Sequence, residues 1–109
     1  MIKNDILISM QKIQKGFYYH FKHNPGISLN NYAYKVIGTA KHSETEEVTV
    51  IYKPMYKNEW LGEAELMSRP IDMFLDTVEK PEYSGLRFRL IEDPEIIAKL
   101  SDIRDGLDK

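Results

Sequence analysis

The stretch that decides the fold is residues 34–56, with the sequence YKVIGTAKHSETEEVTVIYKPMY. Two segments in which every second side chain falls on the same face flank a polar turn at residues 42–45. The residues that share a face are Tyr34, Val36, Gly38 and Ala40 before the turn, and Val48, Val50 and Tyr52 after it. A period of two residues is typical of half-buried strands. The stretch therefore predicts a β-hairpin, and Gly38 predicts a bulge or bend in its first strand.

The composition is that of one ordinary globular domain without cysteine. The chain has 109 residues, 42% of them hydrophobic, and a formal net charge of −2. The absence of cysteine excludes disulfides, zinc–thiolate sites and thiol nucleophiles. No apolar run approaches the roughly 20 residues that a membrane-spanning helix needs, and the first residues lack the apolar core of a signal peptide. We therefore expect a cytoplasmic protein without membrane contact.

Charge is divided unevenly along the sequence. Residues 1–41 contain six lysines and one aspartate, a net charge of +5, whereas residues 42–109 carry 9 basic and 16 acidic side chains, a net charge of −7. Such a division can mark a face that binds polyanions. The lysines are spread over several expected elements, however, and mixed charge is also typical of an ordinary soluble surface. The pattern is compatible with both interpretations.

Three further strands, a helical turn and a C-terminal helix are expected outside the hairpin. The expected strands are residues 17–22, 64–69 and 86–91. Pro70 ends any strand at that point and can start a helical turn. The C-terminal helix is expected from Pro94 to Asp105, because Asp93 is a natural N-cap and proline suits the first helical position.

Five short strands with bends favour a mainly β fold. We expect a small five-stranded SH3-like barrel or roll with short N- and C-terminal helices, because closing the sheet removes exposed strand edges. An N-terminal helix is indicated by apolar residues at helical spacing, namely Ile6, Met10 and Ile13. The expected boundaries are residues 1–15 for the N-terminal helix, 16–92 for the β-barrel and 93–109 for the C-terminal helix, all within one domain.

Several short motifs resemble one uncharacterised bacterial family. They are Gly16-Phe17-Tyr18-Tyr19-His20-Phe21-Lys22, Ala40-Lys41-His42-Ser43-Glu44-Thr45-Glu46, Val50-Ile51-Tyr52, Arg69-Pro70 and Arg87-Phe88. In this order they resemble the family catalogued as domain of unknown function 1653, over residues 16–91. The resemblance implies a small cytosolic β-domain like an SH3-type barrel, and it supplies no activity and no catalytic residue. The chain differs from the family pattern in a longer insertion at residues 23–31, and in having Met67-Ser68 in place of a Trp-Val pair.

The polar turn carries side chains of the types used in catalysis. His42, Ser43, Glu44 and Thr45 supply a base, two hydroxyls and a carboxylate. Neighbouring side chains on an extended segment point to opposite faces, which separates His42 from Ser43. In the competing interpretation the hydroxyls satisfy backbone groups of the turn and the glutamates are solvated. We therefore assign no catalytic residue.

Metal binding has little support in the sequence. The three histidines, His20, His23 and His42, lack the spacing of a common helical metal motif. The first strand and the hairpin can bring His20 and His42 together with Glu44 as a third ligand, but a pair of surface histidines is the simpler interpretation. We expect neither a metal site nor a cofactor.

Aromatic and charged side chains give the better functional indication. Small barrels commonly bind extended peptides or single-stranded nucleic acid through aromatic residues flanked by charges. Arg69 can pair with an anionic ligand group, or it can form an ion pair with Asp72 or Glu44. The predicted ligand groove is formed by His42, Ser43, Glu44, Thr45, Tyr56, Trp60 and Arg69.

Such a groove predicts a non-enzymatic binding module for a peptide, a nucleotide or RNA. One alternative is a small hydrolase or transferase that uses His42 with Glu44, which is disfavoured because a small barrel encloses little volume for a substrate. A second alternative is a structural or dimerising protein, in which the apolar stripes of the terminal helices contact a partner chain. The sequence leaves the oligomeric state open.

Overall fold

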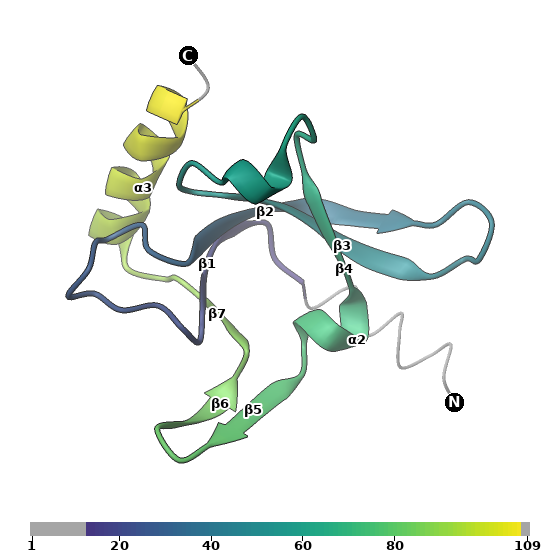
Figure 1. Ribbon diagram of the computed structural model, residues 1–109, viewed down its shortest axis with the longest axis horizontal. Helices are drawn as coiled ribbons and strands as arrows, with labels where there is room; N and C mark the ends of the chain where they lie inside the picture. The colour runs from purple at the N-terminus through teal and green to yellow at the C-terminus, as the bar shows by residue number, and fades with distance from the viewer. Residues whose placement is uncertain (1–12, 108–109) are drawn as a thin grey trace.

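The structure is a computed structural model that describes residues 13–107. Five antiparallel strands form one curved sheet in the order β4-β3-β2-β1-β7, and two further strands form a separate hairpin (Figure 1). The strands of the large sheet are β1 (Gly16–His20), β2 (Ala33–Lys41), β3 (Val48–Pro54), β4 (Met67–Pro70) and β7 (Phe88–Leu90). The small hairpin consists of β5 (Thr77–Lys80) and β6 (Tyr83–Leu86). The mainly β class predicted from the sequence is confirmed.

The hairpin predicted from residues 34–56 is present as β2 and β3. The pairing runs from Tyr34 opposite Pro54 to Lys41 opposite Val48. The register shifts between Val36 and Gly38, so the predicted bulge at Gly38 is confirmed. A bulge increases the local twist of a strand, which contributes to the curvature of the sheet.

Two of the predicted strands are placed differently in the structure. The strand expected over residues 64–69 begins only at Met67, in β4. The strand expected over residues 86–91 is reduced to β7, because residue 86 already belongs to the β5–β6 hairpin. Within residues 13–107 no pairing joins β4 to β7, so these pairings leave the five-stranded sheet open rather than closing it into a barrel.

Three short helical segments connect or follow the strands. They are the 3-10 helix η1 (Glu59–Leu61), α2 (Ile71–Phe74) and α3 (Pro94–Leu107). The helical turn expected after Pro70 is therefore confirmed as α2. The C-terminal helix is also confirmed, and the Glu95 backbone N–H donates to Asp93 Oδ1 at 2.9 Å, as expected of an N-cap. The N-terminal helix expected over residues 1–15 lies outside the described residues, except for 13–15, which are not helical.

Side chains are buried on both faces of the large sheet. One face carries Tyr18, Tyr34, Val36, Val48, Val50, Tyr52 and Phe88, which pack with Ile71 and Phe74 of α2. The other face carries Phe17 and Ala33, which pack with Met55, Ile91 and Leu100 of α3. Helix α3 thus covers only the second face. No helix within residues 13–107 is both long enough and apolar enough to cross a membrane.

Candidate functional site

The polar turn predicted as part of the ligand groove is the exposed tip of the β2–β3 hairpin. His42 Nδ1 accepts hydrogen bonds from the backbone N–H groups of Glu44 and Thr45, both at 3.2 Å. Thr45 Oγ1 in turn accepts one from the Glu47 N–H at 3.2 Å. No hydrogen bond within the described chain joins the His42 ring to the hydroxyl of Ser43 or Thr45. The His42 ring and the Thr45 hydroxyl therefore stabilise the turn itself, as the structural interpretation predicts.

The turn does not lie beside Tyr56 and Trp60. Residues 48 and 54 mark the two ends of β3, and six residues of strand span about 20 Å. The turn follows one end of the hairpin, whereas Tyr56 and Trp60 follow the other, and Figure 1 shows the hairpin tip projecting away from η1. The turn is therefore separated from Tyr56 and Trp60 by about the length of β3. Arg69 lies between them along the hairpin, because it is paired with Val50 of β3.

Trp60 and Arg69 line the same pocket. This pocket has a volume of about 330 Å³ and is formed by Tyr52, Trp60, Leu61, Ala64, Leu66, Met67, Ser68 and Arg69. The Trp60 side chain lies on η1 and is 79% exposed. This part of the predicted groove brings together residues from a loop and from the edge strand β4.

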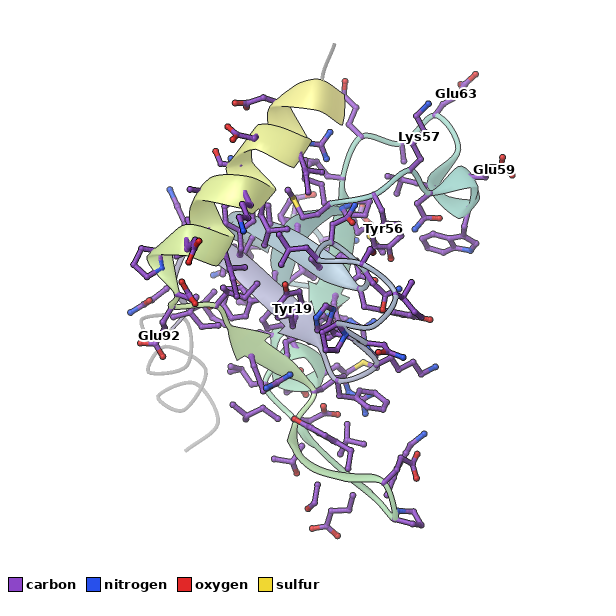
Figure 2. All side chains as sticks on the ribbon, turned by 90° about the vertical axis from the view of Figure 1, so that its left-hand side faces the viewer. Tyr19, Tyr56, Lys57, Glu59, Glu63 and Glu92 are labelled. Carbon is purple, nitrogen blue, oxygen red and sulfur yellow. The ribbon has the colours of Figure 1, made fainter. Side chains whose placement is uncertain are left out.

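Tyr56 lies nearer to the sheet than the rest of its loop. Its hydroxyl is 2.6 Å from the hydroxyl of Tyr34, and the two rings meet edge to face. Burial, the largest cause, raises the pKa of both hydroxyls. Figure 2 shows Tyr56 between the loop and the sheet, with Glu59 and Glu63 at the outer end of the loop. Tyr56 therefore packs against the core of the sheet and does not line the pocket of Trp60 and Arg69.

Arg69 is a partly buried cation that forms no ion pair within residues 13–107. Its Nε donates a hydrogen bond to the Tyr52 hydroxyl at 3.2 Å, and its guanidinium carbon lies 5.2 Å from the centroid of the Phe88 ring. The ion pairs within residues 13–107 are Arg87–Asp76 and Lys99–Glu95. The ion pair to Asp72 or Glu44 considered from the sequence is therefore not formed. The terminal nitrogens of Arg69 have no hydrogen-bond acceptor among the described residues.

Phe88 is the centre of an aromatic cluster under this arginine. The ring centroids closest to Phe88 belong to Phe74 at 4.3 Å, His20 at 5.1 Å, Tyr52 at 5.9 Å and Tyr34 at 6.0 Å. His20 faces Phe88 because the two residues are directly paired between β1 and β7. Arg69 and His20 thus contact the same ring from different strands.

Three cations lie near His20, and together with it they form what we call the basic cluster: His20, Lys22, Arg69 and Arg87. The pKa of His20 is lowered from 6.5 to about 4, mainly by burial and in addition by the positive charges of Arg69, Lys22 and Arg87. His20 Nδ1 accepts a hydrogen bond from the Lys22 backbone N–H at 3.1 Å. At neutral pH the ring is therefore uncharged, and this hydrogen bond assigns its proton to Nε2.

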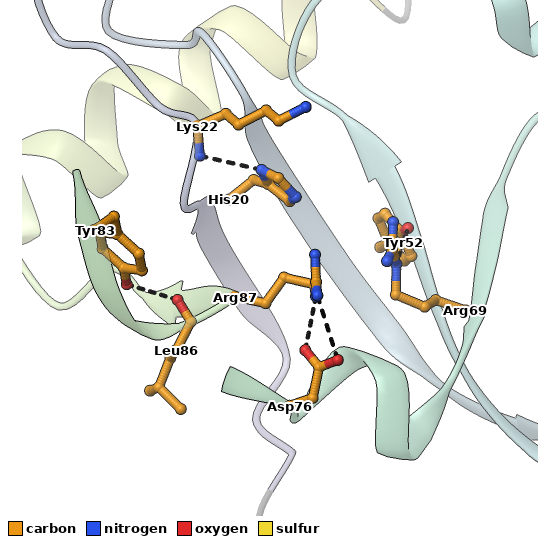
Figure 3. Close-up of polar contacts among 8 residues, drawn as sticks. All are labelled: His20, Lys22, Tyr52, Arg69, Asp76, Tyr83, Leu86 and Arg87. Atoms are coloured by element: carbon orange, nitrogen blue, oxygen red, sulfur yellow. Dashed lines mark hydrogen bonds and ion pairs between the residues drawn. The ribbon is translucent and has the colours of Figure 1, made fainter. Parts of the chain in front are cut away.

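Among the described residues, only Arg87 of the cluster is paired with a carboxylate. Its Nε and Nη2 donate to the two oxygens of Asp76 at 2.7 and 3.4 Å. Figure 3 shows Arg87 between His20 and Asp76, with Arg69 and Tyr52 on the other side of the same space. Three positive charges and one negative charge therefore surround a neutral histidine.

The sequence prediction did not include His20 or Arg87 among the ligand-binding residues. Alternation along the first strand was a usable signal, since it places His20 on the same face as Tyr18. The pairing of His20 with Phe88 joins β1 and β7, which are distant in the sequence. No local sequence pattern indicates this pairing. No group of three His, Asp or Glu residues suited to a metal ion occurs in the described part of the chain.

The fold and the basic cluster define a small antiparallel β-domain in which basic side chains gather around a buried aromatic ring. The family model described as "Protein of unknown function (DUF1653)" matches residues 16–90. The chain therefore belongs to the DUF1653 family, which confirms the resemblance seen in its motifs.

A solved structure supports the same assignment. The crystal structure of a protein belonging to DUF1653 from Bordetella bronchiseptica is similar to this chain, with 26% sequence identity and a TM-score of 0.60. The similarity covers 75% of this chain and 91% of that protein. The comparison with curated proteins found no match.

Proposed function

We propose that the protein is a cytoplasmic, non-enzymatic binding module on a curved SH3-like sheet, and that it holds an anionic ligand group at Arg69. The observation that carries this proposal is the environment of Arg69. Its guanidinium is partly buried over Phe88, and within residues 13–107 it contacts no carboxylate. Removing a charge from water without a partner costs free energy. An anion bound at this position offsets that cost.

The neighbouring side chains favour an anion further. Arg87 and Lys22 are close enough to lower the pKa of His20 together with Arg69, whereas Asp76 is the only carboxylate paired with the cluster in the described chain. A neutral His20 with its proton on Nε2 is a hydrogen-bond donor. The two terminal nitrogens of Arg69 suit a bidentate contact with a carboxylate or phosphate.

The polar hairpin tip supports the enzymatic alternative poorly. His42 Nδ1 already accepts two backbone hydrogen bonds, and the residues of the tip are exposed. A general base needs a free nitrogen within reach of a nucleophile, and no such contact is present at the tip.

The test measures anion binding by two-dimensional amide NMR at low salt, with inorganic phosphate and acetate as probes. We expect saturable shifts around Arg69 and His20 in the wild type. Replacing Arg69 with glutamine should weaken binding at least tenfold, because it removes a charge-assisted, bidentate contact. The matched control is Arg89→Gln, since Arg89 is exposed and lies next to Phe88 on β7. It should bind like the wild type.

Two results would overturn the proposal. One is a wild type that shows no saturable shift with either anion. The other is an Arg69→Gln variant that binds phosphate as tightly as the wild type does. Thermal unfolding of both variants verifies that the fold is retained.

A further inference from the structure

Trp60 is the only tryptophan of the chain and one of its most exposed large side chains. Its backbone is nevertheless fixed. Asn58 caps η1, with its Oδ1 accepting from the Trp60 N–H at 3.0 Å and its carbonyl accepting from the Leu61 N–H at 3.1 Å. An indole ring held by an ordered backbone and left in solvent is suited to stack on a flat ligand group.

The position of Trp60 connects it to the anion site. Trp60 and Arg69 line one pocket of about 330 Å³, a volume within the range of small-molecule sites. Leu61, Leu66 and Met67 make part of its lining apolar, while Ser68 and Arg69 make another part polar. A ligand that matches this lining carries a planar apolar group and an anionic group in one small molecule.

We propose that this ligand is a mononucleotide, with its phosphate at Arg69 and its base stacked on Trp60. The inference rests on the proposed anion site. Arginine suits phosphate because its planar guanidinium can donate two parallel hydrogen bonds. Every nucleobase has a face that can stack on an aromatic side chain.

The charges around Trp60 favour a single nucleotide over a nucleic acid strand. The loop that carries it contains Glu59, Glu63 and Glu65 against the single cation Lys57. Figure 2 shows Glu59 and Glu63 at the outer end of this loop. The next phosphate of a strand passing over Trp60 would approach these carboxylates, and the repulsion between like charges disfavours it. One phosphate at Arg69 avoids this contact.

Trp60 is a built-in reporter for the test, since no other tryptophan contributes to the fluorescence. The probes are adenosine monophosphate, ribose 5-phosphate and adenosine, titrated with excitation at the red edge of the indole band. We expect saturable quenching by adenosine monophosphate. Its dissociation constant should be about tenfold or more below those of the other two probes, because stacking adds to the phosphate contact.

Two variants separate the base contact from the phosphate contact. Trp60→Ala should lose the advantage of adenosine monophosphate over ribose 5-phosphate, measured by NMR, and should still bind ribose 5-phosphate. Arg69→Gln should lose binding of both adenosine monophosphate and ribose 5-phosphate. Because the Trp60 side chain is exposed, its replacement should leave the melting temperature nearly unchanged.

The outcomes distinguish this inference from the proposed function. Equal affinities of the wild type for adenosine monophosphate and ribose 5-phosphate would overturn the proposal of a nucleotide ligand. The proposal of an anion site at Arg69 would be retained. No binding of any anion would overturn both. A hexanucleotide that binds much more tightly than the mononucleotide would indicate an RNA strand instead, and a peptide with a free carboxylate that binds where the nucleotide does not would indicate a peptide ligand.

Discussion

The rings of His20 and Phe88 lie edge to face with their centroids 5.1 Å apart. His20 lies on β1 and Phe88 on β7, which are far apart in the sequence but paired in the sheet. This contact places a histidine among Arg69, Lys22 and Arg87, where burial and nearby positive charge lower its pKa to about 4. The geometry of the sheet thus keeps the centre of the basic cluster uncharged at neutral pH.

The lowered pKa of His20 predicts a pH-dependent stability. The folded ring resists protonation down to about pH 4, whereas the unfolded ring takes up a proton near pH 6.5. The unfolded state therefore binds more protons in this interval, and the free energy of unfolding falls as the pH drops from 6.5 to about 4. Urea titrations at several pH values should show a smaller loss for His20→Gln than for the wild type over this interval.

Direct titration of the imidazole provides a second measurement of the same effect. The midpoint of the His20 ring in proton NMR should lie near pH 4. A midpoint near 6.5 would show that the ring is neither desolvated nor close to the three cations.

Replacing Asp76 with asparagine should strengthen anion binding. The change leaves the positive charge of Arg87 uncompensated and raises the potential at the cluster. The Arg87 and Asp76 side chains are 28% and 40% exposed, so the cost to stability is small, about 0–1 kcal/mol. Calorimetric titration with phosphate at low salt should give a dissociation constant several-fold below that of the wild type.

The control for this prediction is Asp72→Asn. It changes the net charge of the protein equally, but Asp72 is exposed on α2 and forms no ion pair with a described residue. A gain in affinity as large as that of Asp76→Asn would mean that net charge, and not the cluster, determines anion binding.

Truncating Phe88 should destabilise the protein severely. The ring is buried and contacts Phe74, Tyr34, Tyr52 and His20, so Phe88→Ala should lower the free energy of unfolding by about 3–5 kcal/mol. Glu46→Ala, at the exposed hairpin tip, should change it by no more than about 0.5 kcal/mol. Denaturant titrations that give similar values for the two variants would contradict the assignment of the core.

Local sequence patterns were sufficient for several elements. The alternation around residues 42–45 predicted the β2–β3 hairpin, and Gly38 predicted its bulge. Asp93 and Pro94 predicted the start of α3, and Pro70 predicted α2. In each of these cases the deciding interactions join residues close together in the chain, so that periodicity, capping and the fixed backbone of proline determine the local structure.

The β5–β6 hairpin was not predicted, and the reason lies in its burial. Of the residues in its two strands, only Val78 is buried, so the sequence lacks the alternation that marks a half-buried strand. The run from Leu86 onward instead suggested one continuous strand. In the structure Leu86 is the last residue of β6, where it pairs with Thr77, and β7 of the large sheet begins at Phe88.

The candidate site depended on the tertiary structure. The sequence by itself determined that Arg69 precedes a proline-initiated turn and that Trp60 lies in a polar loop. It did not determine that Arg69 pairs with no carboxylate of residues 13–107, that Trp60 and Arg69 line the same pocket, or that the 42–45 turn and Trp60 follow opposite ends of the hairpin. These relationships follow from strand pairings between distant segments, and such pairings are selected by the packing of the whole sheet rather than by any local pattern.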